Sequence, residues 1–257
     1  MTSMFTDFHS KFHATSLQLA GSQENSLTRT LTSARVEMNP HQVNAALFAL
    51  KSPFSKGALL ADEVGLGKTI EAGLVISQRI AEGKRRILLI VPASLRKQWQ
   101  QELQEKFSVQ TQILDAAIVR KSRKRGDQDI FKNTKIPLIM SYEYAARIAE
   151  ELRLAQKWDL IVFDEAHRLR NVYKNEQNKG TSKRAQALAD AFRDIPKILL
   201  TATPLQNSLL ELYGLISVID DKHFGGLDSF RTQYVRGGPD PENLAAMASL
   251  MKRWQAN

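Results

Sequence analysis

The chain has 257 residues, of which 43% are hydrophobic and 25% charged, so it carries enough apolar material for one sizeable core. It contains no cysteine, which excludes a disulfide framework, a thiolate zinc site and a cysteine nucleophile. No apolar run approaches the roughly 18 residues of a membrane span, and the N-terminus lacks the pattern of a signal peptide. We therefore expect no membrane partner and a location in the cytosol or nucleoid.

The net charge of +9 is concentrated in two segments. Residues 120–135 hold seven basic and two acidic side chains, and residues 168–184 hold six basic and one acidic. Two basic segments on a near-neutral body favour a polyanionic partner. Solvated loops that keep the protein soluble are an equally good interpretation of the charge alone.

Along the chain, residues 1–35 are rich in Ser, Thr and Gln and are predicted to be a flexible, polar lead-in. Continuous apolar runs then alternate with amphipathic stretches. The predicted strands are residues 57–60, 86–91, 137–140, 159–163 and 197–200. The predicted helices are residues 41–50, 69–81, 95–107, 143–154, 182–192 and 209–219. Residues 226–257 are predicted to form a partial helical extension.

Continuous apolar strands separated by helices indicate an α/β fold, with a mostly parallel central sheet and helices on both faces. Ligands of such sheets lie beyond the carboxyl ends of the strands. Three candidate site segments begin at those ends, namely residues 61–69, 164–167 and 201–204. Trp99 shares an apolar helix face with Leu95 and is predicted to pack in the core rather than stack on a base.

The first of these segments reads ADEVGLGKT, follows a strand and opens a helix, as a phosphate-binding loop must. Gly65 and Gly67 allow close approach of the backbone, and the helix adds the positive end of its dipole. Lys68 can reach the β- and γ-phosphates of ATP, and the Thr69 hydroxyl can reach Mg²⁺. The general pattern has glycine where this chain has Asp62. A glycine-rich turn without a ligand is the alternative.

The second segment places two acids, Asp164 and Glu165, directly after an apolar strand. An acid in this position can bind Mg²⁺, so Asp164 is the predicted metal residue. The next acid can take a proton from the attacking water, so Glu165 is the predicted general base. The alternative is a helix N-terminus whose acids favour the helix dipole.

With these residues in view, the chain resembles the Swi/Snf-type helicase-like ATPases of superfamily two, in which an Asp is common at the position of Asp62. Further segments match that family's elements in the family's order, between about residues 38 and 225. These segments are His41-Gln42, VPASLRKQW at 91–99, MSYE at 140–143, DEAHRLRN at 164–171 and LTATPLQN at 200–207. The sequences of these segments are most similar to those of bacterial members, such as the translocases that recycle RNA polymerase. This similarity implies a nucleoid-associated location.

The resemblance implies a RecA-like lobe over residues 36–225 that binds ATP and Mg²⁺ and grips double-stranded DNA. It implies that Gln42 contacts adenine and that Ser94, Arg96 and Ser141 contact the DNA backbone. Phosphate contacts of this kind position a duplex without reading its sequence. Each residue has an ordinary alternative: an exposed Gln42, a helix cap at Ser94 and a turn at Ser141.

The resemblance also marks the segment around Thr201 and Thr203 as the element that couples hydrolysis to movement. We expect a hydrogen bond from His167 to link this element to residues 164–167, which we call the acid box. In this family a second RecA-like lobe closes over the ATP, and the stretch from Thr203 to Asn257 is too short to form one. We therefore expect a motor lobe that needs a second lobe, in cis or in trans, and that is weakly active or inactive alone.

The predicted function is the ATP-binding lobe of a DNA-dependent ATPase that translocates on duplex DNA, with RNA polymerase or another complex as a possible protein partner. A strand-separating helicase or a restriction-system motor would use the same residues. A third hypothesis is non-enzymatic, a nucleotide-gated module that binds DNA or protein.

Overall fold

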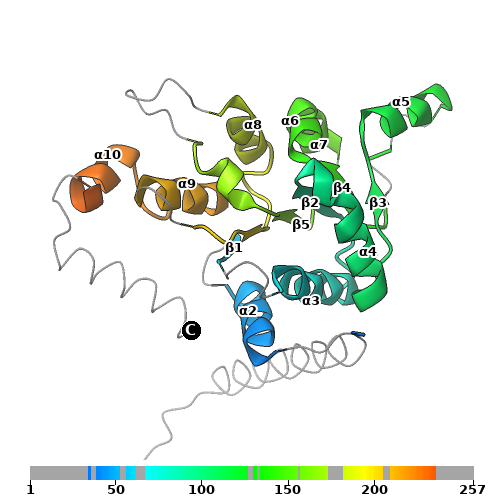
Figure 1. Cartoon of the computed structure of the whole chain (residues 1–257). Helices are drawn as coiled ribbons and strands as arrows, with labels where there is room; N and C mark the ends of the chain where they lie inside the picture. The colour runs from blue at the N-terminus through cyan, green and yellow to red at the C-terminus, as the bar shows by residue number, and fades with distance from the viewer. Residues whose placement is uncertain are drawn as a thin grey trace, which may run out of the picture.

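The protein is a three-layer α/β structure, seen here in a computed structural model (Figure 1). The structure describes residues 34–35, 39–52, 56–61, 67–126, 130–131, 134–155, 157–172, 182–204 and 209–235. The predictions for the lead-in, apart from Ala34 and Arg35, and for residues 236–257 of the extension lie outside this range.

Six strands form the central sheet, in the order β1-β6-β5-β2-β4-β3 (Figure 1). They are β1 (Gly57–Leu60), β2 (Ile87–Val91), β3 (Gln112–Ile113), β4 (Leu138–Ser141), β5 (Leu160–Phe163) and β6 (Lys197–Leu200). Every pairing between neighbours is parallel, so the predicted fold class is confirmed. The carboxyl ends of all six strands therefore lie at one edge of the sheet.

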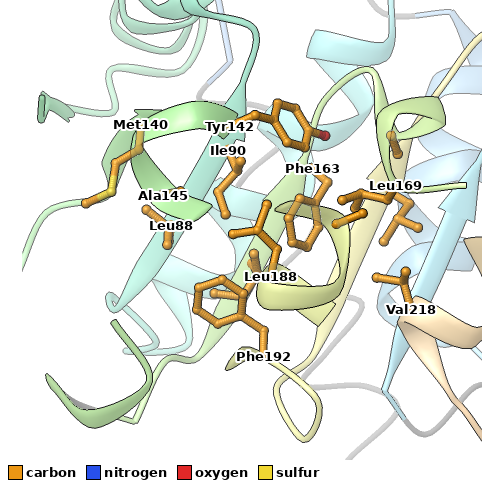
Figure 2. Close-up of a cluster of buried hydrophobic side chains, with 14 of the residues drawn as sticks. Leu88, Ile90, Met140, Tyr142, Ala145, Phe163, Leu169, Leu188, Phe192 and Val218 are labelled. Carbon is orange, nitrogen blue, oxygen red and sulfur yellow. The ribbon is translucent and has the colours of Figure 1, made fainter. Parts of the chain in front are cut away.

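Helices cover both faces of the sheet, because alternate strand residues point to opposite sides. In β2, Leu88 and Ile90 join one core cluster, whereas Leu89 and Val91 join the other. The first cluster, part of which is drawn in Figure 2, packs under α6 (Tyr142–Arg147), α7 (Ala149–Ala155), α8 (Lys183–Ala191) and α9 (Leu209–Ile219). The second packs under α2 (Pro40–Leu50), α3 (Lys68–Ala81) and α4 (Arg96–Phe107). On α4 the predicted apolar face is buried through Trp99, Leu103 and Phe107.

Shorter elements connect these layers. They are η1 (Ala93–Leu95), α5 (Ala116–Lys124), η2 (Ala166–Leu169), α10 (Leu227–Phe230) and the π-helical turn η3 (Arg231–Val235). No helix within the described part of the chain is long and apolar enough to cross a membrane.

The structure corrects the prediction of a single helix over residues 143–154. The chain instead forms α6 and α7, because Ile148 leaves the helical region with φ −110° and ψ 21°. Two elements had not been predicted. β3 is only two residues long, and α5 lies in a segment whose dense positive charge indicated a loop. Asp115 starts α5 by accepting hydrogen bonds from the Ala117 and Ile118 amides, both at 2.9 Å.

Candidate functional site

The described residues of the three predicted site segments lie at the carboxyl edge of the sheet. β6 lies between β1 and β5, so the segments that follow these three strands are neighbours. Backbone hydrogen bonds continue the sheet into the site: the Thr201 amide donates to the Leu60 carbonyl at 3.1 Å, and the Asp164 amide donates to the Ile90 carbonyl at 3.0 Å. The edge thus brings the start of α3, the acid box and Thr201 together.

The described end of the phosphate loop has the form of an anion site. Gly67 caps α3 with a left-handed φ of 93°, and a Cβ there would lie 2.2 Å from Gln42 Nε2. Lys68 and Thr69, both half-buried, form the first turn of α3, where backbone amides and the helix dipole favour a negative ligand. Asp62 and Gly65 lie outside the described residues, so their roles stay predictions.

Gln42 is buried and not exposed, since only 3% of it is accessible. Its Oε1 accepts a hydrogen bond from the Asn39 amide at 3.0 Å and forms a capping box at the start of α2. Its amide group also packs against Gly67. Gln42 therefore ties α2 to the phosphate loop, and its contact with adenine stays a prediction.

Asp164 is the most constrained side chain of the site. It is 7% exposed, its Oδ1 accepts a hydrogen bond from the Glu165 amide at 2.9 Å, and its Oδ2 accepts one from Trp99 Nε1 at 2.7 Å. Burial raises the pKa of Asp164, while the bond from Trp99 and the charge of Lys68 act in the opposite direction.

A second buried group holds the backbone at the same residue. The Tyr142 hydroxyl donates a hydrogen bond to the Asp164 carbonyl at 2.7 Å, beneath the end of β5 (Figure 2 shows Tyr142 beside Phe163). Burial raises the pKa of Tyr142 well above its ordinary value, so the hydroxyl stays a donor at neutral pH. Sequence reasoning found Trp99 only as a core residue and gave Tyr142 no role.

Glu165 and His167 face each other at the rim of the site. Glu165 has a left-handed φ of 51°, a strained conformation for a side chain of this type, and it is about one-third exposed. His167 Nδ1 lies 3.1 Å from Glu165 Oε2, outside hydrogen-bond geometry. Thr201 is fully buried, and its Oγ1 accepts from the Thr203 amide at 3.2 Å. Within the described residues no hydrogen bond joins His167 to either threonine, so the coupling link stays a prediction.

The available oxygen atoms suit Mg²⁺. A Thr69 hydroxyl and an Asp164 carboxylate are hard oxygen ligands, and Mg²⁺ sites on nucleotides typically use one or two such groups together with phosphates and water. The described residues contain no group of three or more His, Asp or Glu side chains that could hold a metal without these partners. The donor set therefore fits a metal that arrives with a nucleotide.

The predicted DNA contacts lie beyond β2 and β4 on the same edge. Ser94 is exposed, and the N-cap residue of α4 is Leu95, with no side-chain cap, so the helix-cap interpretation of Ser94 is wrong. Arg96 donates to the Ala93 carbonyl at 3.1 Å. Ser141 is buried and caps α6 by accepting from the Tyr144 amide at 3.2 Å. Of these three residues, Ser94 and Arg96 therefore present polar groups at the surface.

The basic segment 120–135 begins as a helix and not as a loop. α5 and α6 border a groove of about 530 Å³ lined by Arg120, Arg123, Lys124 and Arg147 together with Tyr144. Arg123 pairs with Glu151, and Arg147 lies over the Tyr144 ring, 5.2 Å from its centroid. Of the other basic segment, residues 173–181 lie outside the described range.

A parallel six-stranded sheet with helices on both faces is the fold of the RecA-like core of SWI2/SNF2 proteins. The SNF2-related domain family matches residues 34–255, and the chain belongs to that family. The expected family is confirmed.

Curated relatives include "Uncharacterized ATP-dependent helicase YqhH" of Bacillus subtilis (strain 168), which is 36% identical over 202 residues, covering 77% of this chain and 32% of the relative. "RNA polymerase-associated protein RapA" of Stutzerimonas stutzeri (strain A1501) is 32% identical over 228 residues, covering 88% of this chain and 23% of the relative. The chain thus spans about a third or less of these relatives' length.

Solved structures confirm the fold. The Sulfolobus solfataricus SWI2/SNF2 ATPase core in complex with dsDNA superposes with a TM-score of 0.65 at 21% identity, covering 84% of this chain and 43% of that one. A second solved structure, the Sulfolobus solfataricus SWI2/SNF2 ATPase core domain, superposes with a TM-score of 0.62 at 18% identity, covering 85% of this chain and 42% of that one.

Proposed function

We propose that this chain is the ATP-binding lobe of a DNA-dependent ATPase that translocates on double-stranded DNA. The observation that carries the proposal is that the parallel sheet brings the start of α3, with Lys68, and the buried carboxylate of Asp164 to the same edge. A cation beside a helix N-terminus and an acid at a strand end form the two sides of a nucleotide-phosphate site. Membership of the SNF2-related family supports the assignment of that nucleotide as ATP.

Each residue has a separate task. Lys68 and the first amides of α3 bind the phosphates, and Thr69 and Asp164 hold Mg²⁺, which neutralises phosphate charge when bound. Glu165 is about one-third exposed and can therefore reach a water molecule, from which it accepts a proton. Gln42, from its buried position against Gly67, orients the loop and contacts the adenine.

The proposed partners extend beyond ATP. Ser94 and Arg96 contact the backbone of a DNA duplex, and the solved Sulfolobus solfataricus core in complex with dsDNA supports this partner. A second RecA-like lobe, in cis or in trans, completes the ATPase site. RNA polymerase is a candidate protein partner, because several relatives are named RNA polymerase-associated.

The substitution Glu165→Gln tests the chemistry. It removes the proton acceptor and keeps the size of the side chain, so Mg·ATP binding should persist while hydrolysis slows by roughly 10²-fold or more. Single-turnover hydrolysis of radiolabelled ATP is measured with a protein that contains this lobe and a second lobe, in molar excess over ATP, because the lobe alone is expected to be weakly active or inactive. Parent and variant hydrolysing at the same rate would remove Glu165 as the base.

Strand separation is the second candidate activity, because one relative carries the name ATP-dependent helicase. Translocation without separation displaces a triplex-forming third strand but leaves the duplex intact. A protein that contains this lobe and a second lobe should therefore release the third strand and fail to unwind a forked duplex. Release of single strands from the fork would favour the helicase.

A further inference from the structure

Asp164 accepts hydrogen bonds from side chains on both faces of the sheet. Trp99 belongs to the core cluster under α2, α3 and α4, and Tyr142 belongs to the cluster on the opposite face. Trp99 Nε1 donates to the Asp164 carboxylate at 2.7 Å, and the Tyr142 hydroxyl donates to the Asp164 carbonyl at 2.7 Å. One side chain fixes the acid group, and the other fixes the backbone that carries it.

The hydrogen bonds from Trp99 Nε1 and from the Glu165 amide leave the carboxylate little freedom to rotate. Trp99 is 3% exposed, so water cannot replace Asp164 as the acceptor for its N–H group. A hydrogen bond to a charged acceptor is also stronger than a neutral one. Trp99 and the Glu165 amide each occupy one carboxylate oxygen, and each oxygen has a further lone pair to offer a cation.

Trp99 and Tyr142 both belong to segments that resemble DNA-contacting elements. Trp99 lies about one helical turn after Arg96, the first residue of α4, and the exposed Ser94 lies two residues before that helix start. Tyr142 is the first residue of α6 and follows Ser141 at the end of β4. Arg168, four residues after Asp164, lies over the Tyr142 ring, 5.7 Å from its centroid. Each of these two segments that resemble DNA-contacting elements thus supplies one hydrogen bond to Asp164.

We propose that Trp99 and Tyr142 are positioning residues that orient Asp164 for Mg²⁺ and link its metal affinity to duplex DNA bound at residues 94–96. The proposal rests on the proposed function, because it assigns Asp164 to Mg²⁺ and residues 94–96 to DNA. A shift of α4 on DNA would move the indole donor that is bonded directly to the Asp164 carboxylate, while the Tyr142 hydroxyl holds the Asp164 backbone. By thermodynamic linkage, the factor by which DNA changes the affinity for Mg·nucleotide is also the factor by which Mg·nucleotide changes the affinity for DNA, and we expect both affinities to increase.

The substitution Trp99→Phe tests the first half. Groups bonded to a metal ligand typically change metal affinity by about 10–100-fold when removed. The Mg²⁺ concentration at half-maximal binding of a fluorescent ATP analogue should therefore rise about 10-fold or more. Trp158→Phe is the matched control, because Trp158 is also buried and donates from Nε1, at 2.9 Å, to the Leu152 carbonyl away from the site. Equal Mg²⁺ midpoints for the two variants would overturn the role of Trp99.

Tyr142→Phe tests the second contact, with Tyr213→Phe as its control. The Tyr213 hydroxyl also donates to a backbone carbonyl, that of Gly225 at 2.8 Å. We expect Tyr142→Phe to raise the Mg²⁺ midpoint several-fold and Tyr213→Phe to leave it unchanged. Equal midpoints for this pair would overturn the role of Tyr142.

A duplex DNA arm tests the link between the two ligands. Saturating duplex should lower the Mg²⁺ midpoint of the parent chain, and the effect should shrink in Trp99→Phe and Tyr142→Phe. A parent midpoint that is the same with and without duplex would overturn the link. Lys68→Ala separates this failure from failure of the proposed function, because a Lys68→Ala chain that binds the nucleotide as the parent does would reject the nucleotide site itself.

The emission of Trp99 gives a readout that needs no variant at the site. In a chain with Trp158→Phe and Trp254→Phe, Trp99 is the only indole, and its bond to Asp164 makes its emission sensitive to a cation at that carboxylate. Adding Mg²⁺ with a non-hydrolysable ATP analogue should shift the emission, whereas the analogue with EDTA should not. Identical spectra under the two conditions would contradict the proposal even if Trp99→Phe failed to fold.

Discussion

Lys197 shows at the scale of one residue how burial changes a charge. It begins β6 with no accessible surface, and its Nζ donates to the Arg193 and Ile195 carbonyls at 3.1 and 2.9 Å. Burial lowers the pKa of Lys197 from 10.5 to about 8. The unfolded chain therefore holds this proton over a pH range in which the folded chain has released it.

This pKa predicts a rise in stability with pH. Below about pH 8 Lys197 is protonated in both states, and burial of its charge opposes folding. Between that pH and 10.5 the unfolded state binds more protons, so the free energy of unfolding increases. From about pH 7 to about pH 9.5 the parent should gain roughly 1–2 kcal/mol relative to Lys197→Met, measured by urea unfolding. Parallel pH profiles for the two proteins would contradict the lowered pKa.

Sequence patterns predicted residue environments better than residue contacts. Trp99 was correctly predicted to be buried, since its spacing from Leu95 defines an apolar helix face. Its bond to Asp164 joins residues 65 positions apart, and no local pattern encodes such a contact. The burial of Gln42 and Ser141 was missed for a similar reason, because their capping bonds depend on where each helix starts.

At the scale of elements, a glycine of α9, Gly214, lets this helix pack closely against the backbone that follows the acid box. A Cβ at Gly214 would lie 2.1 Å from the Arg170 carbonyl oxygen, which follows η2. Gly214→Ala gains about 1 kcal/mol of helix propensity, but a clash with backbone cannot be relieved by a side-chain rotation. We expect a net loss of about 1–2 kcal/mol in the free energy of unfolding.

Gly226→Ala is the control, because a Cβ at Gly226 meets no atom within 4 Å and its φ of −70° suits alanine. Urea unfolding should place Gly226→Ala near the parent and Gly214→Ala below both. A Gly214→Ala protein as stable as Gly226→Ala would show that α9 can move away from η2 at little cost.

The groove beside α5 predicts a salt-dependent affinity for DNA. Within the described part of the chain, Arg120 and Lys124 line it without an acidic partner like the one that Arg123 has in Glu151. If they contact two phosphates, replacing both with Ala should weaken duplex binding and reduce the slope of log affinity against log salt by about 2.

The matched control for the groove is the pair Lys84→Ala and Arg85→Ala, which removes the same charge just before β2, at the opposite edge of the sheet. Fluorescence anisotropy with a labelled duplex at several salt concentrations measures both slopes. Identical slopes for the two double variants would return residues 120–135 to the interpretation of a solvated surface.

Element prediction succeeded where the apolar pattern was long. The five predicted strands formed within a residue of their predicted bounds, because buried parallel strands are continuous apolar runs. β3 has only two residues, too few to show a pattern. α5 carries an N-cap signal at Asp115, but its basic side chains concealed the helix. The break at Ile148 depends on how α6 and α7 each pack against α8, which lies over 30 residues later in the chain.

At the scale of the molecule, the sheet explains why distant segments form one site. Parallel pairing directs every strand's carboxyl end to the same edge, so the convergence of the segments that follow β1, β5 and β6 was predictable from the fold class alone. The strand order was not, because crossover connections of similar length permit several orders. That order places β6 between β1 and β5, and therefore Thr201 between the phosphate loop and the acid box.

The site carries the residues that we propose bind nucleotide and metal, and the chain spans about a third or less of the length of its curated relatives. Binding of Mg·ATP is therefore the property that the described residues should show most directly. Hydrolysis and movement depend in addition on the proposed second lobe.

Titration of Mg·ATP into the parent chain, Lys68→Ala and Lys84→Ala, followed by calorimetry, tests the central claim. Lys68 contributes a charged hydrogen bond to phosphate, so its loss should weaken binding at least about 10-fold. Lys84→Ala removes the same charge at the opposite edge of the sheet and should bind as the parent does. Equal affinities for Lys68→Ala and the parent would contradict an ATP site at the start of α3.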